Sequence, residues 1–167
     1  LPQDVILFDG SVAENIARMA VKPDDEAVVL AAKRAGAHEL ILGLPQGYDT
    51  PVSAGGGKLS GGQRQRIGLA RAMFGDPAVV ILDETNSNLD SAGSEALNNA
   101  IEDLKRRDKA VIIMAHRPAA IHHCDLILMM EGGVRKAFGP KDEVLRQHVR
   151  NWPQVGPAGP RRGQVSG

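Results

Sequence analysis

The residues best suited to chemistry begin at Ser60, which two glycines and Gln63 follow. Serine is a good helix N-cap, and a glutamine three residues later completes a capping box that occupies two unpaired backbone donors. Each glycine in a first helical turn costs roughly 1 kcal/mol relative to alanine, which suggests that another group must approach the backbone closely. A helix N-terminus without side chains offers free N–H groups and the positive end of a dipole. Ser60, Gly61 and Gly62 are therefore predicted to bind an anion such as phosphate.

A second reactive pair, Asp83 and Glu84, follows an apolar run over residues 79–82. Such a run is typical of a strand buried on both faces, and ligands bind at the carboxyl ends of strands in open α/β sheets. Asp83 could hold a magnesium ion, which takes oxygen ligands. Glu84 could orient or deprotonate an attacking water. The alternative interpretation is a strand end with two solvated acids.

Two other stretches only imitate known sites. GGGK at residues 55–58 resembles a phosphate loop, but the pattern G-x-x-x-x-G-K-[ST] requires Gly at position 52 and Ser or Thr at 59, where Val52 and Leu59 stand. The adjacent residues HHCD at 122–125 cannot all face one metal ion, and no second cluster completes a tetrahedral site. We interpret the first as a flexible lead to Ser60 and the second as a turn between a helix and a strand.

Hydrophobic periodicity, caps and chain breakers predict the elements that must position these residues. We expect helices over 12–19, from Pro23 to before Gly36, over 38–42, from Ser60 to Gly75, over 91–105 and over 141–149. We expect strands over 79–82, 110–115 and 126–130, the last in a hairpin that runs through Phe138, and a loop over 43–57.

Five motifs resemble those of the ABC-type ATPases and follow each other along the chain in the family's order. LSGGQ followed by RQR at 59–66 is similar to the signature motif, and VVILDE at 79–84 is similar to the Walker B strand. SNLD at 87–90 resembles the D-loop, and IIMAHR at 112–117 resembles the strand and histidine of the H-loop. PQD at 2–4, with Leu7 and Phe8, resembles the Q-loop, so that the resemblance covers roughly residues 1–148.

The resemblance implies an α/β fold of the P-loop NTPase type, with a partial, mostly parallel sheet and a helical signature subdomain. It places the partial ATPase domain at residues 1–150, with the helical subdomain over about 11–76 and the α/β core part over about 77–150. Residues 151–167 are rich in glycine and proline, and they are predicted to form a disordered tail.

The resemblance also implies ATP and Mg²⁺ as cofactors, and it assigns catalytic roles. Glu84 would act on the attacking water, and His116 would hydrogen-bond the γ-phosphate and help to fix that water. Gln3 would offer its carbonyl oxygen to magnesium or to the water, and with Asp83 it would form the metal site. Taken alone, Gln3 reads as a polar turn residue and His116 as a structural histidine. Thr85 stands where the family usually has proline, which loosens the turn that aims Glu84.

In the family, the signature of one subunit reaches the γ-phosphate that the opposite subunit's P-loop holds. The resemblance thus implies a homodimer, and it adds cofactor-binding roles for Leu59, Ser60, Gly61, Gly62, Gln63, Asp83 and Asp90. Many exporters carry a glutamate where this chain has Ala54, so that contact between subunits is not expected here.

The finer resemblance is to the ATPases of type I secretion, particularly the alkaline-protease exporter group. It rests on LPQDV with LFDG at the start, AENIAR at 13–18, LPQGYDT at 44–50, NSNLD at 86–90 and AFGP at 137–140. It implies a transmembrane domain in the same exporter, a membrane-fusion protein and an outer-membrane channel as partners. The chain would then work at the cytoplasmic face of the bacterial inner membrane and drive export of a protein such as a protease.

Bulk properties exclude several other classes. Lys+Arg and Asp+Glu balance at 20 each, and aromatic residues make up 3% of the chain, which argues against a nucleic-acid partner. No apolar run approaches the ~20 residues needed to cross a bilayer, and the single Cys124 excludes an internal disulfide. We expect a soluble domain in a reducing compartment.

No Walker A motif occurs in the 167 residues, and the first residue is Leu1. We therefore expect a C-terminal fragment that neither binds ATP tightly nor hydrolyses it alone, because the P-loop cradles the β- and γ-phosphates. Without the P-loop strand, the sheet would have a gap, or the strands at 110–115 and 126–130 would close together. Two alternatives stay open: a non-catalytic module that pairs with an intact subunit, and an ABC-type chromosome or repair ATPase. The latter usually carry coiled coils or zinc modules, and neither heptads nor paired cysteines are present.

Overall fold

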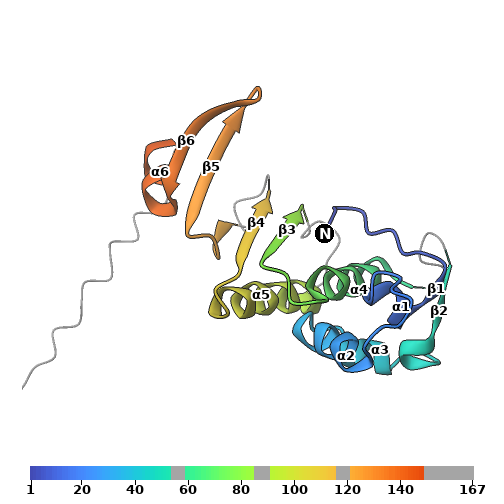
Figure 1. The fold of residues 1–167 in the computed structure, drawn as a ribbon. Coiled ribbons are helices and arrows are strands. Elements are labelled where there is room, and N and C mark those ends of the chain that lie inside the picture. Colours follow the sequence, from blue (N-terminus) through green and yellow to red (C-terminus); the bar gives the residue numbers. More distant parts are fainter. Residues whose placement is uncertain (54–58, 85–90, 116–120, 149–167) are drawn as a thin grey trace, which may run out of the picture. The chain divides into compact units, whose positions relative to one another are not determined.

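The computed structural model describes residues 1–53, 59–84, 91–115 and 121–148. The chain divides into two compact units, Leu1–His123 and Cys124–Gly167. The described strands form three sheets of two strands each, β1 with β2, β3 with β4 and β5 with β6 (Figure 1).

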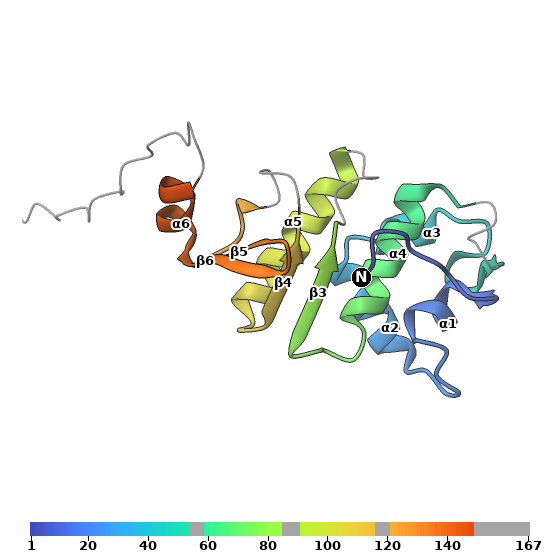
Figure 2. The same ribbon diagram turned by 90° about the horizontal axis from the view of Figure 1, so that it is seen from above.

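Four helices make up the helical part of the first unit (Figures 1 and 2). They are α1 (Val12–Ile16), α2 (Asp25–Arg34), α3 (His38–Leu42) and α4 (Gly61–Met73). Asp24 caps α2 by accepting a hydrogen bond from the Glu26 amide, and acidic residues occupy its first turn, as the helix dipole favours.

Helix α1 begins as the sequence predicts and ends earlier. The Ser11 side chain accepts from the Glu14 amide, and the Glu14 side chain accepts from the Ser11 amide, so the predicted capping box is confirmed. The expected helix to residue 19 is wrong, because Arg18 and Met19 take left-handed φ values of 57° and 59°. The amide of Met19 then bonds the carbonyl of Glu14 at 2.8 Å and closes the last turn.

The stretch expected to be a plain loop contains two short elements. Residues Gly47–Asp49 form the 3₁₀-helix η1, and β2 (Pro51–Val52) pairs antiparallel with β1 (Gly10–Ser11). The expectation of no regular structure over 43–57 is therefore wrong for these residues, and residues 54–58 lie outside the described ones. Proline is tolerated here because β2 is only two residues long and lies at an edge.

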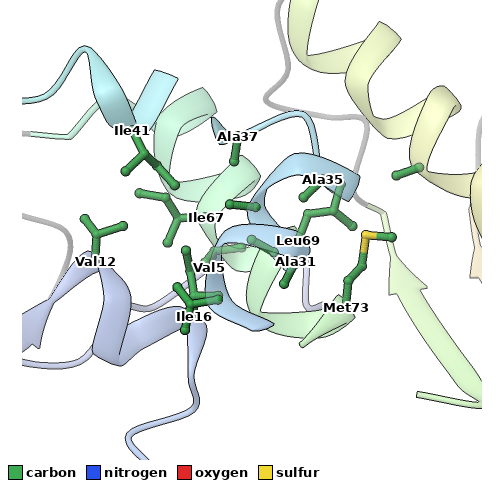
Figure 3. Packing of buried hydrophobic residues seen from close by; sticks show 14 of the residues in the cluster. Val5, Val12, Ile16, Ala31, Ala35, Ala37, Ile41, Ile67, Leu69 and Met73 are labelled. Carbon is green, nitrogen blue, oxygen red and sulfur yellow. The ribbon is translucent and has the colours of Figure 1, made fainter. Parts of the chain in front are cut away.

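The core of this unit is built around α4, which packs against α1 and α2. Its apolar face supplies Ile67, Leu69 and Met73, which lie among side chains of the neighbouring helices (Figure 3). Fully burying a side chain of this kind contributes about 1.5–3 kcal/mol to stability. The core therefore holds α4, and with it Ser60, in a defined place.

A parallel pair of strands and one helix complete the first unit. Strand β3 (Val79–Asp83) lies beside β4 (Ala110–Met114), with Val79 opposite Ala110 and Asp83 opposite Met114. Helix α5 (Ser91–Arg106) provides the crossover that a parallel pair needs. Its buried residues include Leu97, Ala100, Ile101 and Leu104.

The expectation that these strands are buried on both faces is wrong for the described residues. Val80 and Leu82 are buried in the core, whereas Val79 and Ile81 are 51% and 49% exposed. On β4 the outward residues Ile112 and Met114 are similarly exposed, at 51% and 47%. The reason is that the described core covers one face of the pair only.

The second unit holds an antiparallel hairpin and a final helix. Strands β5 (Leu126–Glu131) and β6 (Val134–Pro140) are joined by two glycines with φ of 57° and 77°, the backbone that a tight hairpin turn needs. Helix α6 (Lys141–His148) follows, and residues 149–167, with the predicted tail, lie outside the described ones. In the described part of the chain, the parallel pair is β3 with β4.

Candidate functional site

The signature residues form the start of α4. Ser60 is the N-cap; its Oγ accepts from the Gln63 amide at 3.2 Å, and Gln63 Oε1 accepts from the Ser60 amide at 2.8 Å. The predicted capping box is therefore confirmed. Leu59 is buried beneath it, and its carbonyl accepts from the Arg64 guanidinium at 2.8 Å, which ties the turn before the helix to the helix itself.

Gly61 and Gly62 leave the tip of α4 open. A Cβ built at either glycine meets no atom within 4 Å, and Ser60 and Gly61 are exposed. In the described part of the chain, no hydrogen bond to the amide of Gly61 or Gly62 is found. Two unpaired N–H groups at the positive end of a 13-residue helix are suited to an anionic oxygen.

The acid pair lies at the carboxyl end of the parallel strands. Asp83 is the last residue of β3 and is half-buried. Glu84 has φ of 45°, an uncommon conformation for a residue with a side chain, and its amide donates to the Met114 carbonyl at 3.0 Å. The chain therefore turns out of β3 at Glu84, although the Glu84 amide is still hydrogen-bonded to β4.

Residues 1–9, which we call the Gln3 segment, reach this acid pair. The Leu1 nitrogen donates to the Ile81 carbonyl at 2.7 Å, and the Asp83 amide donates to the Leu1 carbonyl at 2.9 Å. Gln3 is exposed two residues beyond this contact. The structure thus brings the Gln3 segment to the edge of β3 at Asp83.

Two residues that the sequence reading did not assign to the site hold the other end of the Gln3 segment. Asn15, fully buried, accepts from the Phe8 amide at 2.8 Å and donates to the Phe8 carbonyl at 2.9 Å. The Arg71 guanidinium lies 5.5 Å from the centre of the Phe8 ring, a cation–π contact. Burial, followed by the charge of Arg18, lowers the pKa of Arg71. The signal for Asn15 was available: it is a polar residue on the apolar face of α1.

The chain direction brings the α4 tip and the acid pair to the same end of the first unit. Helix α4 and strand β3 are joined by the five residues 74–78 and run in opposite directions (Figure 2). The N-terminus of α4 and the carboxyl end of β3 therefore face the same way. The tip is open rather than buried against the interior, and the acids lie at the end of the strands where ligands bind.

Several predicted site residues cannot be placed. Asp90, His116 and Thr85 lie outside the described residues, as does Ala54. No group of three or more His, Cys, Asp or Glu side chains able to hold a metal is found in the described ranges. Residues 122–125 form a turn there, as predicted. Asp83 and Gln3 carry the oxygen donors that Mg²⁺ prefers, so their chemistry fits a magnesium site completed by other ligands.

The sequence of this chain is similar to those of known proteins. Residues 1–87 match the family model described as ABC transporter. The chain is 55% identical over 150 residues to the type I secretion system ATP-binding protein PrsD of Rhizobium meliloti (strain 1021), a match that covers 90% of this chain and 26% of the relative. It is 46% identical over 143 residues to a putative multidrug export ATP-binding/permease protein of Staphylococcus aureus (strain NCTC 8325 / PS 47), a match that covers 86% of this chain and 25% of the relative.

A solved structure agrees with these relatives. A bacterial Atm1-family ABC exporter with ATP bound aligns with 87% of this chain and 25% of its own, with a TM-score of 0.78 and 34% identity. The chain thus spans about a quarter of the length of the curated relatives it matches. No helix in the described ranges is long and apolar enough to cross a bilayer.

The family match takes in more than half of the 167 residues, and the aligned exporter shares the α/β fold of an ABC-type ATPase domain. The chain belongs to the ABC transporter family.

Proposed function

We propose that this chain is the C-terminal part of the ATP-hydrolysing domain of an ABC exporter that drives type I secretion of a protein. The observation that carries the proposal is the open glycine tip of α4 at the same end of the unit as the acid pair after β3. The similarity to a type I secretion system ATP-binding protein supports the export assignment.

The signature tip recognises the terminal phosphate of ATP. The Gly61 and Gly62 amides and the Ser60 hydroxyl donate to its oxygens, with Leu59 and Gln63 holding the tip in shape through burial and the capping box. The open space at both glycines fits a phosphate group. A phosphate bound at this tip also needs a P-loop to hold it from the other side, a pattern that these 167 residues do not contain. A second subunit whose P-loop faces this tip satisfies that need, with Asp90 contributing to the same nucleotide.

The acid pair and the Gln3 segment act on water and metal. Asp83 and Gln3 would hold Mg²⁺, which supplies positive charge next to the phosphates when bound. Glu84 orients or deprotonates the water that attacks the γ-phosphate, and His116 fixes that water and the phosphate. The backbone hydrogen bonds of Leu1 with Ile81 and Asp83 hold the chain two residues before Gln3 against the end of β3, which supports this role.

The assembly follows from the same proposal. The intact exporter subunit, of which this chain forms the C-terminal part, works as a homodimer joined to the transmembrane domain of the exporter, at the cytoplasmic face of the bacterial inner membrane. A membrane-fusion protein and an outer-membrane channel complete the export route, and no nucleic acid takes part. The cargo class, a protein such as a protease, rests on the resemblance to type I secretion ATPases.

Alone, the 167-residue chain should not hydrolyse ATP, because it lacks the P-loop amides and lysine that cradle the β- and γ-phosphates. Phosphate release by the purified chain, measured with excess ATP and Mg²⁺, is expected to stay at the buffer rate. Release that Glu84→Gln abolishes would contradict this expectation, since it would show a complete site within this chain.

In the intact exporter subunit, Ser60→Arg should abolish hydrolysis and secretion with little effect on ATP binding by the isolated domain. The arginine side chain fills the open space that the phosphate needs, whereas the P-loop of the same subunit is untouched. Nucleotide binding by filter assay and phosphate release in proteoliposomes measure the two effects. Ala20→Arg places the same side chain at an exposed position away from the tip and serves as the control. Unchanged transport by Ser60→Arg would count against the assignment.

The absence of a P-loop pattern favours a second candidate for the chain as it stands: a non-catalytic module that pairs with an intact subunit. Its signature tip could complete the nucleotide site of that partner. Mixing the purified chain with an intact subunit distinguishes the two, because only the module interpretation predicts a stable complex with altered hydrolysis.

A further inference from the structure

Gly68 is a glycine in the interior of α4, seven residues after Gly61, where a helix does not need one. A Cβ at this position would lie 2.6 and 2.9 Å from the two Cγ atoms of Val5 and 3.0 Å from Cδ1 of Leu1. The first two distances are shorter than real Cβ contacts. Alanine would stabilise an ordinary helix relative to glycine, so the glycine is explained by its neighbours rather than by the helix.

Those neighbours flank Gln3. Val5 is 8% exposed and belongs to the core, and Leu1 packs against it. Leu1 also makes the two backbone hydrogen bonds to β3 described above, one of them from the Asp83 amide. The Gln3 segment therefore passes through a narrow space between the middle of α4 and the edge of β3. The missing side chain at Gly68 sets the width of that space.

We propose that Gly68 is a positioning residue for Gln3. By letting Val5 and Leu1 pack directly on the backbone of α4, it seats the Gln3 segment on β3 and holds Gln3 beside Asp83. This placement of the Gln3 segment depends only on contacts within this chain. Its consequence for catalysis rests on the proposed ATPase function, in which Gln3 serves the metal and the attacking water.

The packing of the Gln3 segment on β3 can be tested without nucleotide. In the purified chain, Gly68→Ala should increase the exchange rate of the Asp83 amide about tenfold or more, because that amide bonds the carbonyl of Leu1. The Ala110 amide, which bonds the Ala78 carbonyl at 2.9 Å, should keep its rate, because it belongs to the other side of β3. Amide exchange followed by NMR reports both sites. Equal acceleration at both amides, or none at Asp83, would overturn the proposal.

Removing the clash should restore the placement. Val5→Ala deletes both methyl groups nearest to the new Cβ, so the double variant Gly68→Ala with Val5→Ala should return the Asp83 exchange rate toward that of Val5→Ala alone. Gly43→Ala is the matched control. It adds the same single methyl group, but at the residue that follows α3, where the nearest atom to the new Cβ is 3.4 Å away. It should leave the Asp83 amide unchanged. Additive effects of the two substitutions would contradict direct packing between residues 5 and 68.

The catalytic consequence has a separate readout. In the intact exporter subunit, Gly68→Ala should lower kcat for ATP hydrolysis with little change in KM, and Val5→Ala should partly rescue kcat. A wild-type subunit without ATPase activity would refute the proposed function and leave the exchange experiment as the test of placement. Faster exchange of the Asp83 amide in Gly68→Ala with an unchanged kcat would refute the catalytic role of the placement.

Discussion

Asp76 carries a carboxylate on which three cationic side chains converge. Its carboxylate pairs with Lys109 at 2.9 Å, with Arg34 at 3.3 Å and with Arg107. Arg107 is held in turn by Asp103, one turn earlier in α5, at 3.0 Å. An isolated surface pair contributes little, but one carboxylate shared by several hydrogen-bonded cations forms a network. Asp76 thereby links α2, the turn before β3 and the end of α5.

This network predicts a pH dependence. Hydrogen bonds from Lys109 and Arg107, and the charges of both, lower the pKa of Asp76 from its ordinary value of 3.8. A lowered folded-state pKa means that the stabilisation is complete above 3.8 and is lost as the pH falls through the folded-state pKa. The Tm of Asp76→Asn should therefore lie below that of the wild type at neutral pH, and the gap should narrow in acid.

Thermal melts of the two chains from pH 7 down to pH 3 measure the gap. Asp4→Asn, at an exposed position, serves as the control and should show little difference from the wild type at any pH. A gap for Asp76→Asn that stays constant through the acid range would contradict an ionic origin.

Among elements, α5 shows how amphipathic spacing fixes both a helix and its packing. The predicted helix over 91–105 is observed as Ser91–Arg106, and Leu97, Ala100, Ile101 and Leu104 are buried as the spacing indicates. Ala96, predicted to face inward, is only partly buried, although it lies close to Gly36, where an added Cβ would come within 2.8 Å of the Ala96 Cβ.

Leu104→Ala tests this packing. The side chain is 1% exposed, and its truncation should lower the free energy of unfolding by about 2–5 kcal/mol through lost burial and the cavity left behind. Urea titration followed by circular dichroism measures the loss. Leu42→Ala makes the same change at a residue that is 55% exposed, and it should cost less than about 1 kcal/mol. Similar losses for the two variants would show that α5 is not docked as described.

Element starts were more predictable from the sequence than element ends. Caps are local: Ser11 with Glu14 and Ser60 with Gln63 form the boxes that their spacing indicates. The end of α1 depends instead on Arg18, whose guanidinium donates to the carbonyls of Arg71 and Ala72 at the end of α4. Arg18 and these carbonyls are more than 50 residues apart in the sequence, so the local sequence around α1 does not indicate the contact.

On the scale of the whole molecule, the family, the fold class and the order of motifs could be predicted because each motif is a short local pattern. The packing that supports the site could not. Gly68 packs on Val5 and Leu1 from a helix that lies far from the Gln3 segment in sequence, whereas Asn15, which holds Phe8, is only seven residues away from it. The exposure of one face of β3 and β4 was also not predicted, because the apolar run over residues 79–82 does not indicate which neighbours cover each face.

In the proposed function, the signature tip of one subunit and the acid pair of the other share a nucleotide. Mixing two inactive variants of the intact subunit, Ser60→Arg and Glu84→Gln, tests it most directly. Mixed dimers carry both defects in one site and leave the other site whole, so the mixture should regain about a quarter of the wild-type hydrolysis rate, because half of the dimers are mixed. If each site were built within a single copy, the mixture would stay as inactive as either variant alone, and that result would contradict the account.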